Sequence, residues 1–271
     1  MLLYRSNPSV VETAGYHVLL EGAAQHLEWL SLGLITLHRN NPHVSSSTGS
    51  HEAGLVVLDG TVTITVQQRR FVKLGHRRSV FEAPPAFVYV PIHSDYEVLL
   101  ESESAHVAVC LAKATRAYEP FAVSPEEVTR TQRGDHQWRR EVRDVLVANG
   151  EGRVDRLVLG ETINEPGAWS GYPPHRHEEE RPGEEVKLEE AYYFKLDPPG
   201  GFGIQVHYDS HYHDDMGFLV RDGDAFAIPD GYHPVVAAGG YRLYYLWFMA
   251  GPSGRTLMPF EDPQHRWVKE L

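Results

Sequence analysis

Two histidines separated by one residue, His175 and His177, are the first candidates for chemistry in this chain of 271 residues. In an extended strand, residues i and i+2 point to the same face. Both imidazoles can then reach a single metal ion at about 2.0–2.1 Å. Pro173 and Pro174 precede the pair and bias its approach away from helix. This segment is therefore typical of half of a metal site.

Further ligands can come from two later segments. Glu190 precedes the aromatic run at residues 191–194, and Glu189 beside it is the alternative in the neighbouring register. His233 ends a Pro-X-Gly-X-His turn. Imidazoles and a carboxylate hold a divalent metal ion well and can leave positions open for a substrate. The three segments together predict one divalent metal ion, and Zn, Mn and Fe are the metals that we favour.

A second pair with the same spacing, His211 and His213, shows that spacing alone decides little. Asp214 and Asp215 follow it, no proline precedes it, and no Glu-led aromatic strand comes after it. Isolated pairs of this kind occur by chance. We interpret the second pair as part of a solvent-exposed loop between strands.

The composition excludes several classes of protein. The net charge of −12, from 25 basic and 37 acidic residues, argues against binding to nucleic acid or to anionic membranes, which require a basic surface. The single cysteine, Cys110, rules out an internal disulfide and is compatible with the cytoplasm. It lies in an apolar alternation and is expected to be buried. No stretch approaches the roughly 18 apolar residues of a membrane-spanning helix.

The elements that must position these residues are strands. Short β-branched runs alternate with Gly and Pro turns, and Asp59-Gly60 joins two of them in a strong hairpin signal. We therefore expect an all-β fold of two small barrels or jelly rolls, in an N-terminal half at residues 1–125 and a C-terminal half at 126–271. Residues 1–20 read as irregular, 40–50 as a loop, and 138–146 as either helix or strand. The signature at 124–127 predicts a helix start.

The order of the His pair, the Glu-led strand and the Pro-X-Gly-X-His turn resembles the two sequence motifs of the cupin superfamily. An acidic insertion at 178–187 separates the pair from the glutamates, which leaves Glu189 and Glu190 as alternatives. More specifically, the chain resembles the 5-deoxy-glucuronate isomerase family of bacterial inositol catabolism, a two-cupin family related to the 5-keto-4-deoxyuronate isomerases. The segments that carry this resemblance are 79–82, 88–91, 160–163, 169–177, 189–193, 229–234, 244–245 and 249–252.

The resemblance implies a double cupin with its metal in the C-terminal half. In the related isomerases three histidines and a glutamate hold the metal, which corresponds here to His175, His177, His233 and Glu190, with Glu189 in the competing register. The N-terminal half contains no His-X-His motif, and we expect it to be a supporting barrel without a metal.

The reaction that the resemblance implies is the isomerisation of 5-deoxy-glucuronate to 5-dehydro-2-deoxy-gluconate. This aldose–ketose conversion moves a proton from C2 to C1, so it needs a base and a group that polarises the carbonyl. For the base the candidates are Glu189, Tyr192 and His207. For substrate hydroxyls they are Gln205 and Tyr245, and for the substrate carboxylate Lys187, with Arg176 and Arg242 as further cations.

Two other functions are compatible with the same residues. A bicupin dioxygenase would use the open metal positions for O₂, and a non-catalytic cupin would only bind sugar. The complete set of candidate ligands argues against the second. In each case the expected partner is a small molecule, of uronate type for the isomerase, and apolar strand faces on two barrels favour a homo-oligomer.

Overall fold

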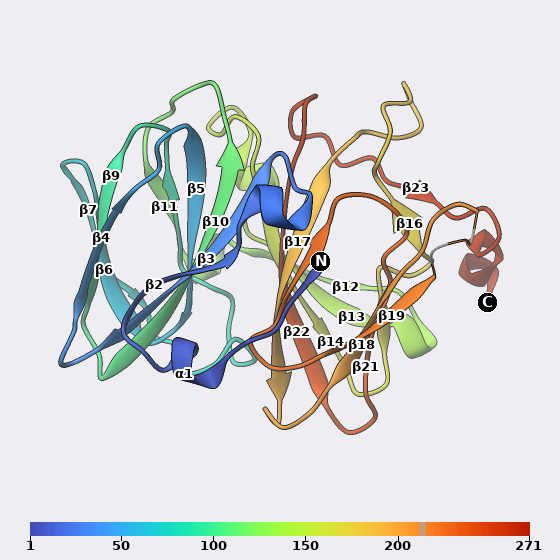
Figure 1. Ribbon diagram of the computed structural model, residues 1–271, viewed down its shortest axis with the longest axis horizontal. Helices are drawn as coiled ribbons and strands as arrows, with labels where there is room; N and C mark the ends of the chain where they lie inside the picture. The colour runs from blue at the N-terminus through green and yellow to red at the C-terminus, as the bar shows by residue number, and fades with distance from the viewer. Residues whose placement is uncertain (212, 214) are drawn as a thin grey trace.

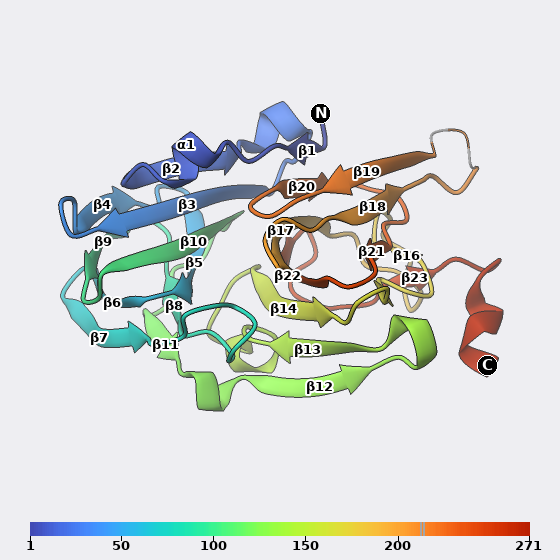
Figure 2. The ribbon, with the colours of Figure 1, turned by 90° about the horizontal axis from the view of Figure 1, so that it is seen from below.

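Strands form almost all of the regular structure in the computed structural model, which describes residues 1–211, 213 and 215–271. Figures 1 and 2 show two halves side by side, each built from facing sheets, with the N-terminus between them and the C-terminus at the far end of the second half. The all-β prediction is confirmed. Each half has the open form of a jelly roll, because its sheets are separate rather than one closed ring.

The first half contains a six-stranded and a four-stranded sheet. The six-stranded sheet has the order β11-β8-β5-β10-β3-β2, with strands β2 (Gly15–Leu20), β3 (Leu30–His38), β5 (His51–Asp59), β8 (Phe87–Val90), β10 (Ser104–Lys113) and β11 (Phe121–Val123). The four-stranded sheet has the order β4-β9-β6-β7, with strands β4 (His43–Ser47), β6 (Thr61–Val66), β7 (Arg69–Gly75) and β9 (Asp95–Leu100).

The second half has larger sheets. Its main sheet has the order β1-β20-β17-β22-β14-β13-β12, with strands β1 (Leu3–Tyr4), β12 (Thr129–Arg133), β13 (Arg140–Asp144), β14 (Val158–Asn164), β17 (Glu189–Asp197), β20 (Ala225–Ile228) and β22 (Arg242–Ala250). The facing sheet has the order β15-β21-β18-β19, with strands β15 (Trp169–Ser170), β18 (Gly203–His207), β19 (Met216–Val220) and β21 (Val235–Ala237). A separate pair joins β16 (His175–Arg176) to β23 (Phe260–Glu261).

The central strands of the two main sheets correspond. In the main sheets β5 lies between β8 and β10 in the same way that β17 lies between β20 and β22. The chain's first strand, β1, lies in the main sheet of the second half, where Leu3 pairs with Phe226. The sequence did not predict that β1 lies in the sheet of the second half, because a strand of two residues is too short to show an alternation of apolar and polar side chains.

Helices are few and short. They are α1 (Pro8–Val11) and the 3-10 turns η1 (Gly22–Gln25), η2 (Pro125–Glu127), η3 (His136–Trp138), η4 (Ala148–Gly150) and η5 (Arg266–Glu270). The start signal at Ser124 is confirmed, because its side chain and that of Glu127 form a capping box around η2. Of the described helices, none has the length and apolar character needed to cross a bilayer.

Three segments differ from the expectation. Residues 1–20 contain β2, and residues 40–50 contain β4. β4 is rich in Ser, which does not favour a strand, and its hydrogen bonds to β9 hold it in the sheet. Both are edge strands, for which side-chain alternation is a weak signal. The undecided stretch 138–146 forms strand β13, which is paired on both sides, with β12 and β14.

A continuous apolar core joins the two halves. Leu32 and Phe87 of the first half belong to the same buried cluster as Leu159 and Phe248 of the second. Cys110 lies in this cluster and is fully buried, as predicted. The inner sheet faces therefore bury apolar area against each other, which is the main favourable contribution to a fold of this kind.

Charged side chains cross the same interface. The carboxylate of Glu161 on β14 accepts hydrogen bonds from Arg77 of the first half at 2.7 and 3.1 Å and from Arg143 at 3.1 Å. It also accepts one from the hydroxyl of Tyr244 at 2.8 Å. All three charged side chains are almost inaccessible to water. Loss of the carboxylate would leave the buried guanidinium of Arg77 without its counter-ion and that of Arg143 with Glu141 alone.

We therefore predict that Glu161→Gln lowers the free energy of unfolding by roughly 3–5 kcal/mol, the usual cost of breaking a buried ion pair from one side. Urea denaturation measures this change. The control is Arg78→Ala, which removes the exposed pair between Arg78 and Glu82 and should cost less than about 1 kcal/mol. Equal, small effects of both changes would contradict the importance given to the buried network.

Candidate metal centre

Strand geometry brings His175 and His177 to one face. His175 lies on β16, opposite Glu261 of β23, and the two imidazole rings lie 6.3 Å apart. Arg176 between them points the other way, where it is buried against Glu178 and Glu185. The i, i+2 rule thus separates the two imidazoles from the guanidinium that lies between them in sequence.

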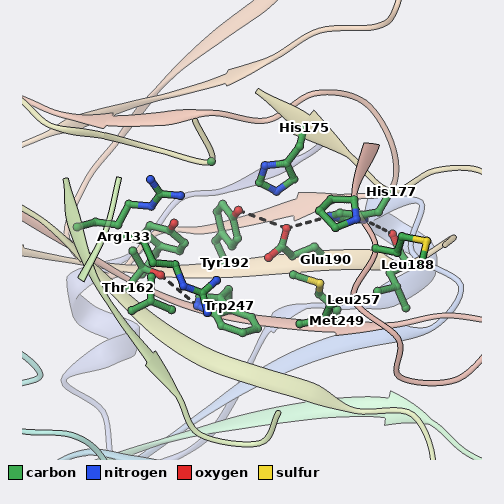
Figure 3. Close-up of a pocket in the computed structure, with 16 residues that line it drawn as sticks. Arg133, Thr162, His175, His177, Leu188, Glu190, Tyr192, Trp247, Met249 and Leu257 are labelled. Atoms are coloured by element: carbon green, nitrogen blue, oxygen red, sulfur yellow. Dashed lines mark hydrogen bonds and ion pairs between the residues drawn. The ribbon is translucent and has the colours of Figure 1, made fainter. Parts of the chain in front are cut away.

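Glu190 and His233 arrive from the main sheet. On β17, Glu190 lies between Ile228 of β20 and Met249 of β22, and His233 follows β20. The Oε2 atom of Glu190 lies 3.2 Å from Nε2 of His177 and 3.1 Å from Nε2 of His233. Ligand nitrogens of the three histidines lie within 4.8 Å of one another. Figure 3 shows Glu190 between Tyr192 and His177, below His175.

Backbone carbonyls fix the orientation of two of these rings. Nδ1 of His177 lies 2.6 Å from the carbonyl oxygen of Leu188, and Nδ1 of His233 lies 2.9 Å from that of Gly231. Each Nδ1–H therefore donates to a carbonyl, so each ring, once Nε2 has lost its proton, presents the lone pair of that atom to the cluster. Burial lowers the pKa of His177, but the carboxylate of Glu190 outweighs it and raises this pKa, so a metal ion would displace a proton there. Metal-binding histidines are oriented in this way. Nε2 of His233 is buried and has no hydrogen-bond partner among the described residues.

The protonation states also suit a cation. Burial disfavours the charged form of His175, and the neighbouring His233 and His177 add to the effect, so that its pKa falls to about 3. Burial alone would favour a neutral Glu190, but His177 and His233 outweigh it and lower the pKa of this carboxyl group to about 2. The cluster therefore offers a neutral imidazole beside an ionised carboxylate, a donor set that suits Zn, Mn or Fe.

The cluster forms part of the wall of a cavity of about 290 Å³. Tyr192 and Tyr245 contribute polar atoms, and the ring centroids of these two residues lie 4.5 Å apart. The hydroxyl of Tyr192 lies 3.3 Å from Oε2 of Glu190. The other lining residues are Arg133, Arg140, Val142, Thr162, Gly171, Leu188, Trp247, Met249, Leu257, Met258 and Pro259.

The acidic insertion at 178–187 is an ordered loop that supports the cluster. Buried Glu185 accepts hydrogen bonds from the backbone amides of Glu178 and Glu179 at 2.7 and 3.1 Å. Glu178 in turn accepts one from the amide of Gly231 at 2.8 Å. The loop thereby links the His pair to the turn that carries His233. A run of acidic residues gave no sign of this role in the sequence.

Three other residues that the sequence predicted for the site lie outside the cavity. The carboxylate of Glu189 accepts hydrogen bonds from the amides of Glu28 and Trp29 of the first half, both at 2.7 Å, so it points away from the cavity. His207 contacts Asp230, and Lys187 is exposed. These three residues do not line the cavity.

Gln205 is buried behind the cluster rather than in the cavity wall. Its amide donates to the carbonyl oxygen of His233 at 2.9 Å, so it supports the turn that carries this histidine. Among the predicted proton-transfer and hydroxyl-binding residues, only Tyr192 and Tyr245 line the cavity.

The cations of the cavity are residues that the sequence did not single out. Arg140 and Arg133 line it, whereas Arg176 is paired with the acidic loop and Arg242 with Asp197. Arg140 lies in the undecided stretch 138–146, and a strand assignment there, paired with the residues before it, would have placed both arginines on one hairpin. His211 and His213 are exposed and lie outside the cluster, and Tyr212 and Asp214 lie outside the described residues.

In the first half an apolar residue takes the place of the carboxylate. Ala53 lies between Val90 of β8 and Leu111 of β10, which is the register position of Glu190 in the second half. Ala53 and Val90 are fully buried in an apolar cluster.

The fold and the cluster together define the class as a double cupin with one histidine-rich centre, and comparison with known structures agrees. An IolB-like protein from Salmonella typhimurium LT2 superposes with a TM-score of 0.90 over 99% of both chains, at 29% identity. Oxalate decarboxylase from Lactobacillus farciminis superposes with a TM-score of 0.66 over 96% of this chain and 88% of that one, at 9% identity. The predicted double cupin is confirmed.

The chain belongs to the KduI/IolB family, whose model matches residues 3–268. A relative from Geobacillus kaustophilus named 5-deoxy-glucuronate isomerase is 40% identical over 82% of this chain and 80% of its own length. A relative of the same name from Bacillus subtilis strain 168 is 34% identical over 81% of this chain and 80% of its own length. The predicted family and the predicted enzyme class, an isomerase, are confirmed.

We predict that His175→Ala abolishes the binding of divalent metal, because one of four converging donors is lost. Metal analysis of the purified protein measures the stoichiometry. The matched control is His211→Ala, which alters an exposed histidine of the other His-X-His pair and should leave the metal content unchanged. The choice of pair is wrong if His211→Ala is the change that removes the metal.

Proposed function

We propose that this chain converts 5-deoxy-glucuronate to 5-dehydro-2-deoxy-gluconate in the cytoplasm, as a step of myo-inositol catabolism, with one divalent metal ion. The observation that carries the proposal is the convergence of His175, His177, His233 and Glu190 beside a cavity, which all of them except His233 line. The relatives named 5-deoxy-glucuronate isomerase support the choice of substrate. The expected homo-oligomer stays a prediction.

These four residues would hold the metal ion. The donor set supports this assignment, because two rings are fixed by carbonyls and present Nε2 to the carboxylate. A divalent cation held there supplies Lewis-acid polarisation of the substrate's aldehyde oxygen. Glu190 rather than Glu189 is the proposed ligand, since the backbone amides of Glu28 and Trp29 already engage Glu189.

Glu190 and Tyr192 are the groups that we assign to proton transfer. Among the described residues that line the cavity, Glu190 is the only carboxylate, and the hydroxyl of Tyr192 lies 3.3 Å from it. Oε2 of Glu190 faces the histidines and would bind the metal ion, so the second oxygen, Oε1, accepts the proton when the C2–H bond breaks and returns this proton to C1. Tyr192 Oη passes the hydroxyl proton from O2 to O1. The substrate is oxidised at C2 and reduced at C1, so no external oxidant is needed.

Chelation tests the metal dependence. The wild-type protein should turn over the deoxy-uronate without consuming oxygen, lose this activity with its metal in a chelator, and recover it when Zn, Mn or Fe is added. Metal analysis and an anaerobic assay are run on the same samples. Oxygen consumption would instead indicate a dioxygenase, and binding of metal and sugar without turnover would indicate a non-catalytic module.

We further predict that Tyr192→Phe lowers kcat by about 10²–10⁴-fold, the usual contribution of a positioned proton-transfer group, while the metal content is unchanged. Tyr193→Phe is the matched control. Tyr193 follows on the same strand but belongs to the core between the halves, so its kcat should stay within about threefold. Equal losses in both variants would remove Tyr192 from the mechanism.

A further inference from the structure

Two arginines stand directly opposite each other on one wall of the cavity. Arg133 ends β12 and Arg140 begins β13, and the two are register partners in this antiparallel pair. Partners of this kind share a face of the sheet, and like charges there are destabilising. Gly134, at φ 73°, begins the connection, and a Cβ there would lie only 2.9 Å from Nη1 of Arg140. The structure thus holds Arg140 at a position that the positive charge of Arg133 disfavours.

The two arginines differ in their partners. Arg133 turns along the strand to Asp144, whose Oδ2 lies 3.2 Å from its Nη2. Arg140 is mostly buried, yet among the described residues no carboxylate lies within 4.0 Å of its nitrogens. Burial lowers its pKa, and so does Arg133. A guanidinium partly withdrawn from water without a counter-ion carries a desolvation cost, so its position calls for a reason.

The hydrogen bonds of Arg140 leave part of its fork for a ligand. Nη1 donates to the carbonyl oxygens of Trp138 at 3.0 Å and Tyr172 at 3.4 Å. No described contact uses Nε or Nη2. Two carbonyls therefore fix the guanidinium plane while further donors stay available. A planar fork of this kind matches a carboxylate, which it can bind through two parallel hydrogen bonds.

Arg140 also borders the same space as the histidine cluster. Its charge acts on the hydroxyls of Tyr192 and Tyr245 and on the imidazole of His175. Tyr192 connects the two regions, because its hydroxyl also contacts Glu190. A small anion bound to Arg140 therefore lies beside the reacting groups rather than on a remote surface.

We infer that Arg140 is the carboxylate-binding residue of this cavity and selects sugar acids over neutral sugars. The inference rests on the proposed isomerase function and names the group that recognises its substrate class. Arg133, at the rim, adds positive potential that attracts the anion. The carboxylate serves as the counter-ion of Arg140, and this contact sets the position of the substrate's carbonyl end relative to the cluster.

Arg140→Gln tests the inference, because an amide keeps a donor for the carbonyls of Trp138 and Tyr172 but carries no charge. Two substrates are compared: 5-deoxy-glucuronate, and 5-deoxy-glucose, in which a hydroxymethyl group replaces the carboxylate. The control is Arg130→Gln, since Arg130 on the neighbouring strand β12 is exposed and paired with Glu141. The readouts are KM, kcat, metal content and thermal stability.

In Arg140→Gln we expect KM for the uronate to rise about 100-fold with kcat within about threefold, as for the loss of a charge-assisted contact made in both ground and transition states. The kinetic constants for 5-deoxy-glucose should change less than about threefold. If the neutral sugar is not turned over, its inhibition constant as a competitor replaces them. Metal content should be unchanged, and Arg130→Gln should resemble the wild type.

Equal losses with both sugars, or loss of the metal, would overturn the inference and make Arg140 a structural residue. Arg140→Lys separates the same two outcomes if the Gln variant is unstable, because it keeps the charge and should retain preference for the uronate. A wild-type protein that does not act on the uronate at all is a different result. It would refute the proposed function itself.

Discussion

Three imidazoles and a carboxylate are packed together beside a cavity, with His175 partly exposed and the other three groups buried, and this arrangement is unfavourable for a protein without a cation there. The surrounding structure is arranged to hold the groups in place. β16 and the residue that follows it supply two imidazoles, β17 the carboxylate, and the turn after β20 the third imidazole. Carbonyls of Leu188 and Gly231 fix two of the rings. The acidic loop joins these elements to one another, so the donors do not depend on a single segment.

The two halves use one arrangement of strands for different purposes. At the position where the second half has Glu190, the first has Ala53 inside an apolar cluster. The residue before it is a glutamate in both halves, and both glutamates reach across the interface. Glu52 accepts hydrogen bonds from the amides of Asp155, Arg156 and Leu157 at 2.6–3.0 Å. Glu189 accepts hydrogen bonds from the amides of Glu28 and Trp29, which precede β3. These reciprocal contacts fix how the two sheets meet.

The candidate ligands could be found in the sequence because each belongs to a local pattern. The sequence alone shows an i, i+2 pair, a Glu-led strand and a Pro-X-Gly-X-His turn. The choice between Glu189 and Glu190 could not be made from the sequence. Adjacent strand residues point to opposite faces, and only the register decides which face meets the histidines. Arg140 was missed for a related reason: its role depends on what lies opposite it, which no single strand reveals. Edge strands β2 and β4 were missed because their hydrogen bonds, not their composition, make them strands.

The location of β1 has a consequence for the order in which the chain acquires structure during synthesis. Leu3 and Tyr4 are synthesised long before their partners Phe226 and Ala225. Contacts between such distant segments form slowly. The start of the chain must therefore stay unpaired while both halves are assembled, and a nascent chain that stops before β20 has no place for it.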